Sequence, residues 1–361
     1  MGKFHIKFTG DYCGTDGKPN MDMALDLLEP RPEVSWGFLE DQCPRPGDAG
    51  YQDKLYSLSL TPEHVASADA IVVLRPWVQA PAFAQGAGRL IAIGRSGIGY
   101  DKFDLSACTE NDVLVFNSPF GLTHSTASSA LIFILMLARK LPLLQRMVRD
   151  YRWDLQKDAI GTELAGKVLG IVGFGQTARE LVRLLAPFGM IVKAYSPHAD
   201  PAQARELGVT LVDELHPLLR ESDFVSLHTR LDANNHRSFG EREFACMKPS
   251  AFLINIARGE LVDEEVMIHY LREHRIAGAG LDVFETEPLP LSSPLLQLDN
   301  VVLTPHWLAT TREAGRATIV PIIQGLLGLT QGIVPGQVLN PAVLNRKGFL
   351  EKLARWKGAA K

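Results

Sequence analysis

Residues 167–179 read Lys-Val-Leu-Gly-Ile-Val-Gly-Phe-Gly-Gln-Thr-Ala-Arg, and this stretch decides the fold. It begins as a β-branched apolar run, turns at Gly173 and Gly175, and continues into a helical pattern that ends near Leu185. A glycine turn between a strand and a helix points the helix N-terminus, with its unpaired N–H groups, at any anion bound there. Gly173 permits the tight turn, and Gly175 lets a pyrophosphate approach the backbone. Ala178 takes the third fingerprint position, where helix packs on strand.

A second apolar strand, residues 190–195, follows the helix and makes the fingerprint more specific than a lone Gly-x-Gly. Ser196 then stands where NAD-binding proteins usually carry a carboxylate for the adenine ribose and NADP-binding proteins an arginine. The sequence therefore predicts dinucleotide binding, with NAD as the expected cofactor and NADP not excluded. The alternative is an ordinary βα unit without a ligand.

Composition limits the class of protein. The chain has 361 residues, enough for two domains with a core each. Its net charge of −4 gives no basic excess for binding nucleic acid. The longest apolar run, residues 130–138, is too short to cross a bilayer, so no membrane contact is expected. Four scattered cysteines indicate free thiols in a reducing cytoplasm, as small core residues rather than redox catalysts. No metal site is predicted.

Strands and helices alternate along the chain, which predicts parallel sheets in an α/β fold. Residues 1–8 alternate like an edge strand and lack the apolar core of a signal peptide. A long helix is expected over residues 125–139, with a second piece beyond Pro142, and the basic tail 346–361 reads as a surface helix or a frayed end. Further strands are expected at residues 70–74, 89–93, 113–116, 210–212, 224–227, 251–255, 278–282 and 301–303.

The fingerprint lies in the middle of the chain, so the segments on either side of it should form the other domain together. We expect residues 1–118 and 309–361 to form a catalytic domain and residues 119–308 to form the dinucleotide-binding domain.

Three residues that follow apolar strands carry complementary chemistry: Arg258, Glu287 and His306. Ligands of open α/β sheets bind at the carboxyl ends of strands, where such residues can converge. An arginine can bind a carboxylate and an adjacent keto oxygen together, a histidine can exchange a proton near neutral pH, and a carboxylate can orient that imidazole. Hydride transfer at a keto carbon needs these parts, because a nicotinamide supplies only the hydride.

Each of these residues also has a structural interpretation. Arg258 could cap or pair with a helix that starts near Asp263, and Glu287 could be a solvated acid in a turn. Asp282 could be a turn residue rather than part of a nicotinamide pocket, and His306 could be a partly buried histidine. Singly these readings are at least as good as the functional ones. Taken together, the occurrence of these residues in this order after the fingerprint favours the functional interpretation.

The chain resembles the D-isomer-specific 2-hydroxyacid dehydrogenases over most of its length, most densely from about Ile93 to Thr311. Several phrases in the same order carry this resemblance, and they are specific for the family and fold rather than for a substrate. They are residues 97–101 (Gly-Ile-Gly-Tyr-Asp), 117–119 (Asn-Ser-Pro), 164–175, 222–228, 247–249 (Met-Lys-Pro), 255–259 (Asn-Ile-Ala-Arg-Gly), 281–288 and 304–306 (Thr-Pro-His).

The resemblance implies a Rossmann-type dinucleotide-binding domain inserted into a smaller flavodoxin-like α/β catalytic domain, and a homodimer whose arm includes the helix from Ser125. It implies that His306 is the proton donor, Glu287 its partner and Arg258 the substrate anchor. The implied substrate-binding residues are Arg75, Ser96, Gly97, Ile98 and Gly99. The implied cofactor-binding residues are Thr126, Gly173, Phe174, Gly175, Gln176, Thr177, Ser196, His228, Thr229, Ala257 and Asp282.

Four departures from the family pattern stand out. Ser196 replaces the usual ribose acid, and Arg230 stands where a proline is usual, so both leave the cofactor preference open. Ser128 or Ser129 replaces a common glutamate. Trp307 follows the histidine in place of a small aliphatic residue, which suggests an unusual substrate pocket.

The expected function is NAD(P)-dependent oxidoreduction of a 2-keto or 2-hydroxy acid. A non-enzymatic dinucleotide sensor is the alternative, because a transcriptional corepressor, the C-terminal-binding protein, shares the fold and the Arg/Glu/His trio. The lack of a long disordered tail or basic region here favours the enzyme.

Overall fold

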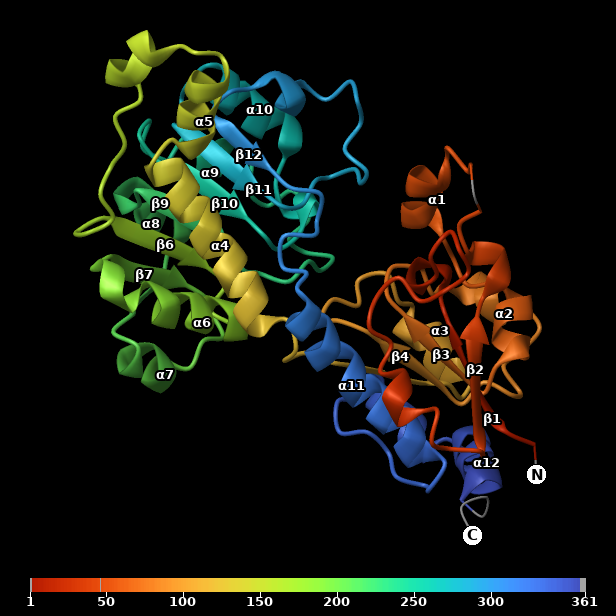
Figure 1. Ribbon diagram of the computed structural model, residues 1–361. Helices are drawn as coiled ribbons and strands as arrows, with labels where there is room; N and C mark the ends of the chain where they lie inside the picture. Colours follow the sequence, from red (N-terminus) through yellow and green to blue (C-terminus); the bar gives the residue numbers. More distant parts are fainter. Residues whose placement is uncertain (1, 46, 358–361) are drawn as a thin grey trace. The chain divides into compact units, whose positions relative to one another are not determined.

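The structure is a computed structural model that describes residues 2–45 and 47–357 (Figure 1). The chain divides into two compact units. The first unit combines the residues up to Leu122 with those from Thr310 onward, and the second is the contiguous segment Thr123–Ala309. In the sequence, the second unit is therefore an insertion into the first.

The first unit contains a five-stranded sheet in which every pair of neighbouring strands is parallel. The strand order, β2-β1-β3-β4-β5, is that of flavodoxin-like sheets. The strands are β1 (Phe4–Phe8), β2 (Val34–Phe38), β3 (Ala70–Val73), β4 (Ala92–Arg95) and β5 (Leu114–Asn117).

Helices cover both faces of this sheet. On one face Ile6 and Val72 share a core with Ile322 of α11. On the other face Ile71 packs with Cys108 of α3. The helices of this unit are α1 (Tyr51–Ser57), α2 (Pro62–Ser67), α3 (Leu105–Glu110), α11 (Arg312–Leu329) and α12 (Lys347–Trp356).

One expectation for this unit is wrong, and another, the helix in the basic tail, holds only in part; residues 358–361 of that tail lie outside the described residues. The N-terminal strand is an interior strand, with β2 on one side and β3 on the other. The basic tail is more than a surface helix, because α12 buries Phe349 in the core. It also buries Lys352, whose ammonium donates to three backbone carbonyls of the same unit.

The second unit contains a seven-stranded parallel sheet of the Rossmann type, in the order β12-β11-β10-β9-β6-β7-β8. The strand order reverses between β6 and β9, the point at which such sheets bind dinucleotides. The strands are β6 (Val168–Val172), β7 (Ile191–Tyr195), β8 (Thr210–Val212), β9 (Phe224–Leu227), β10 (Phe252–Asn255), β11 (Gly278–Leu281) and β12 (Val301–Leu303).

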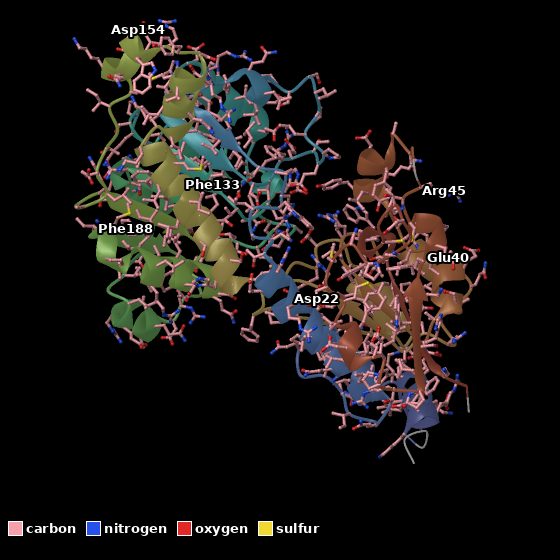
Figure 2. All side chains as sticks on the ribbon, in the orientation of Figure 1. Asp22, Glu40, Arg45, Phe133, Asp154 and Phe188 are labelled. Atoms are coloured by element: carbon pink, nitrogen blue, oxygen red, sulfur yellow. The ribbon has the colours of Figure 1, made fainter. Side chains whose placement is uncertain are left out.

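One face of the seven-stranded sheet packs against α4 and α6, and the other against α8, α9 and α10. Phe133, labelled on α4 in Figure 2, lies so close to β11 that a Cβ on Gly280 would stand 2.6 Å from its Cγ. The helices are α4 (Thr123–Ala138), α5 (Leu141–Arg149), α6 (Gln176–Leu185), α7 (Pro201–Glu206), α8 (Leu215–Glu221), α9 (Glu241–Phe244) and α10 (Glu264–Arg272).

Two further findings concern the chain as a whole. All four cysteines are free thiols, with Cys13 and Cys108 buried. Among the described residues, no single helix has both the length and the apolar composition to cross a bilayer, although α4 and α5, which meet at a 61° bend, satisfy that test as a pair.

Candidate active site

Three residues that the sequence assigned to the site, two to catalysis and Asp282 to the cofactor, follow three neighbouring strands of the seven-stranded sheet. Arg258 lies after β10, Asp282 directly after β11, and His306 after β12. Because these strands are parallel and adjacent, their carboxyl ends share one edge of the sheet. The topology therefore brings the three residues to the same edge.

His306 and Glu287 form a hydrogen-bonded pair. The imidazole Nδ1 lies 2.8 Å from Oε2 and 3.0 Å from Oε1 of Glu287. None of the described residues bonds the other ring nitrogen, Nε2, and the His306 side chain is partly exposed. A carboxylate at Nδ1 fixes the proton there in the neutral ring, so Nε2 is the nitrogen that can exchange a proton with a ligand.

The pKa of the Glu287 carboxyl reflects this pairing. Burial alone would raise the pKa, but the hydrogen bond and charge of His306, with the charge of Arg258, outweigh burial and hold it below its usual value. Glu287 is therefore ionised at neutral pH, and its carboxylate accepts the hydrogen bond from Nδ1 of the imidazole.

Asp282 holds the segment that carries His306. Its Oδ1 accepts hydrogen bonds from Thr304 Oγ1 at 2.6 Å, from Trp307 N at 3.1 Å and from Leu308 N at 3.2 Å. His306 itself adopts φ +51°, a left-handed conformation that is uncommon outside glycine and needs such support. The sequence assigned Asp282 to the cofactor, whereas its hydrogen bonds in the structure hold the segment on both sides of the histidine.

Arg258 stands at a turn that a buried asparagine shapes. Asn255, the last residue of β10, donates through Nδ2 to Arg258 O at 2.8 Å and accepts from Ala257 N at 3.0 Å. Arg258 Nη1 also donates to Ala257 O at 2.7 Å. The sequence placed Asn255 in a phrase shared with the family but gave it no role; its signals are that phrase and a polar residue at the end of an apolar strand.

The fingerprint turn requires glycine at 173 for two reasons. Gly173 adopts φ +90°, and a Cβ there would stand 2.7 Å from Thr229 Oγ1. Gly175 precedes α6 as its N-cap, and a Cβ there would meet no atom within 4 Å, so the backbone is open to a ligand. The side chain of Phe174 packs into the core, so only its backbone is available to a cofactor.

The residues around this turn fit a dinucleotide. Two buried polar atoms in the described part of the chain lack a hydrogen-bond partner here: Gln176 Oε1, in the first turn of α6, and His228 Nδ1, after β9. A cofactor with amide, hydroxyl and phosphate groups could satisfy them. Ser196 directly follows β7, and Thr126 lies in the first turn of α4.

We expect His228 to make the protein sensitive to acid. Burial lowers the pKa of its imidazole from 6.5 to about 4. At pH values between these two pKa values, the folded state therefore binds fewer protons than the unfolded state. The contribution of His228 to the free energy of unfolding should be fully present above pH 6.5 and should be lost as the pH falls toward 4. Between pH 6.5 and 4, the melting temperature of His228→Gln should fall less than that of the wild type. An equal loss in both proteins would assign the acid sensitivity to another group.

In the first unit, Ser96–Gly99 forms a loop after β4. Ser96 N donates to Val73 O at 2.9 Å, and no described group accepts a hydrogen bond from the N–H of Gly97, Ile98 or Gly99. Such unpaired N–H groups can bind a carboxylate. Arg75 follows β3, and its backbone N–H donates to the buried carboxylate of Asp11 at 2.8 Å.

Residues 131–307 match the family model described as "D-isomer specific 2-hydroxyacid dehydrogenase, NAD binding domain". The chain is 37% identical to a glyoxylate reductase from Thermococcus litoralis over 78% of the chain and 86% of that protein. It is 36% identical to the glyoxylate reductase of Pyrococcus furiosus over 91% of the chain and 96% of that protein.

The D-3-phosphoglycerate dehydrogenase of Methanocaldococcus jannaschii is 35% identical over 77% of the chain, but the match spans only 53% of that longer protein. Among solved structures, the holo form of D-mandelate dehydrogenase from Rhodotorula graminis superposes with a TM-score of 0.78 at 25% identity, over 94% of this chain and 98% of that one.

Proposed function

Because the chain belongs to the D-isomer-specific 2-hydroxyacid dehydrogenase family, we propose that it is an NAD(P)-dependent oxidoreductase that interconverts a small 2-keto acid and the corresponding 2-hydroxy acid. The observation that carries this proposal is the His306–Glu287 pair, which lies at the carboxyl edge of a Rossmann-type sheet with Arg258 two strands away.

The chain's own residues account for everything but the hydride, which a bound reduced nicotinamide supplies. Arg258 binds the substrate carboxylate and the keto oxygen, and so polarises the carbonyl. His306 donates the proton on Nε2 to that oxygen during reduction and takes it back during oxidation. Glu287 orients the ring through its hydrogen bonds to Nδ1.

The remaining assignments concern the two units. We propose that residues 1–118 with 309–361 form the catalytic domain and that residues 119–308 form the dinucleotide-binding domain, a division that lies within a few residues of the two compact units. The N–H groups of the Ser96–Gly99 loop bind the substrate carboxylate, and Arg75 contributes positive charge for the substrate.

Oxidation of NADH and NADPH with a panel of 2-keto acids tests the function. Glyoxylate, hydroxypyruvate, pyruvate and 3-phosphohydroxypyruvate cover the activities named for the relatives and their close analogues. We expect turnover with at least one acid, and glyoxylate is the first to test because the glyoxylate reductase of Pyrococcus furiosus matches over 96% of its length. NADH binding without turnover of any acid would favour the dinucleotide-sensing alternative instead.

Cofactor preference should depend on Ser196. No carboxylate stands there to repel a 2′-phosphate, so we expect the wild type to use NADH with modest discrimination against NADPH. Ser196→Asp should sharpen the preference for NADH about tenfold or more by weakening NADPH, since it places like charges together. The ratio of kcat/KM for the two cofactors measures this, with Ser196→Asn as the neutral control. A wild type that already rejects NADPH by orders of magnitude would contradict the role of Ser196.

We also propose a homodimer that forms through the surface of α5 and the segment after it. Exposed apolar side chains gather there, and such patches mark contact surfaces. They are Leu141, Leu144, Val148, Tyr151 and Trp153.

Light scattering should therefore show a dimer, and Val148→Glu should convert it to monomer because a charge would be buried in the contact. Leu350→Glu, which alters a similarly exposed side chain on α12, should leave the mass unchanged. A monomeric wild type would contradict the proposal.

We propose a cytoplasmic location as well. The four free thiols support it, because reducing compartments keep cysteines unpaired.

A further inference from the structure

One arginine ties together both ends of the Ser96–Gly99 loop. Arg95 is the last residue of β4, and its Nε donates to Gly99 O at 2.8 Å. Its Nη1 donates to Ser96 O at the other end of the loop. The rigid fork of a guanidinium can hold two carbonyls in a fixed relation, which a single ammonium cannot do.

A second side chain takes the carbonyl between them. Asn117, the last residue of β5, is buried and donates through Nδ2 to Ile98 O at 2.9 Å. Arg95 and Asn117 are direct partners in the register of the two strands. Two neighbouring strand ends therefore hold the same short loop by its carbonyl groups.

The fixed carbonyls also fix the N–H groups. A trans peptide is planar, so the N–H that follows a carbonyl points to the opposite side. Tying Ser96 O and Ile98 O to Arg95 and Asn117 thus turns the N–H groups of Gly97 and Gly99 away from those side chains. These are among the N–H groups for which the described residues provide no acceptor.

Gly97 fits tightly over the guanidinium. It adopts φ +131°, and a Cβ there would stand 2.8 Å from Arg95 Nη1 and 3.1 Å from Cζ. The arginine therefore packs directly against the backbone of the loop, which places its positive charge behind the N–H groups.

We propose that Arg95 is a positioning residue that, together with Asn117, orients the Gly97 and Gly99 N–H groups for the substrate carboxylate. This inference rests on the proposed function. Arg95 acts through the loop, so its loss should weaken substrate binding more than it slows the chemical step.

Four variants and a control test the role. Arg95→Met removes the fork and the charge, and Arg95→Lys keeps the charge but cannot span both carbonyls. Asn117→Ala releases the loop from the other strand, and the double variant combines Asn117→Ala with Arg95→Met. Arg89→Met is the control, because it removes a guanidinium that forks onto Asp69 elsewhere in the same unit.

Three measurements are needed: KM and kcat for the panel acid with the highest kcat/KM, KM for NADH, and calorimetric binding of oxamate to the NADH-loaded protein. We expect Arg95→Met to raise KM for the keto acid about tenfold or more and to lower kcat less than about threefold. Asn117→Ala should also raise KM for the keto acid. The double variant should raise KM only slightly more than Arg95→Met does, because both residues act through the same loop. The control variant Arg89→Met should have the same KM and kcat as the wild type, and KM for NADH should stay unchanged in all variants.

Two results would overturn the inference. One is an unchanged KM in folded Arg95→Met or Arg95→Lys protein. The other is a large effect of Arg95→Met that Asn117→Ala neither shares nor couples to, which would make Arg95 a direct substrate ligand. A wild type that reduces no acid of the panel would refute the proposed function instead, and oxamate binding by the same variants would still decide the role of Arg95.

Discussion

His306→Ala is expected to lower kcat by about a hundredfold or more while NADH still binds. In the part of the chain that the structure describes, the His306 imidazole bonds Glu287 through Nδ1, and no group bonds Nε2, which is left for a ligand. Alanine therefore removes the proton donor without adding bulk. Steady-state kinetics with the best panel acid, together with NADH titration, measure both parts of the expectation.

The neighbouring carboxylate gives an internal comparison for this result. Glu287→Gln keeps the shape of the side chain but replaces the carboxylate that accepts from Nδ1 with a neutral amide, so its kcat should fall between wild type and His306→Ala. His236→Ala, at an exposed histidine of the same unit, should have no effect. Turnover of His306→Ala near that of the wild type would sink the assignment.

Arg258→Lys is expected to raise the KM for the keto acid about tenfold or more and to lower kcat as well. Lysine keeps the charge, but it cannot bind a carboxylate and a keto oxygen through a planar fork. The backbone at this position should survive the change, because Asn255 holds it through main-chain atoms.

Cofactor affinity distinguishes a role of Arg258 in substrate binding from a role in cofactor binding. Arg258→Lys should bind NADH like the wild type, and Arg272→Lys, at an exposed arginine on α10, should match the wild type in every constant. A variant impaired only in NADH binding would assign Arg258 to the cofactor instead of the substrate.

The sequence predicted the fingerprint unit well because its signals are local. A glycine at positive φ, an apolar run before it and a helical pattern after it lie within about twenty residues, and each has a direct conformational cause. The convergence of Arg258, Glu287 and His306 was predicted from a general property of parallel sheets, since each residue comes after an apolar strand.

The first unit was harder because alternation shows which face of a strand is covered, not where the strand lies in the sheet. In β1 the inward residues alternate with His5 and Lys7, which suggested an edge. The structure instead pairs those two residues with β2, His5 with Ser35 Oγ and Lys7 with Phe38 O. The strand β2 was not predicted, although Val34, Trp36 and Phe38 alternate with Ser35 and Gly37 in the pattern of a strand.

The supports of the site could not be predicted, because they join residues far apart in the chain. Asp282 bonds backbone groups more than twenty residues away, and Arg95 and Asn117 meet only because β4 and β5 pair. Sequence patterns identify residues that can bind a substrate, whereas the residues that hold them in place depend on register and turn geometry.

The division of the chain has a consequence for protein synthesis. A ribosome releases residues in order, so β1 to β5 emerge long before α11, whose Ile319, Ile322 and Leu326 complete one face of their sheet. That face stays uncovered until about Leu329 has been made. The segment Thr123–Ala309 is contiguous and contains all of its own strands before that point. The nascent chain can therefore complete its Rossmann unit while one face of the sheet β1 to β5 is still uncovered by α11.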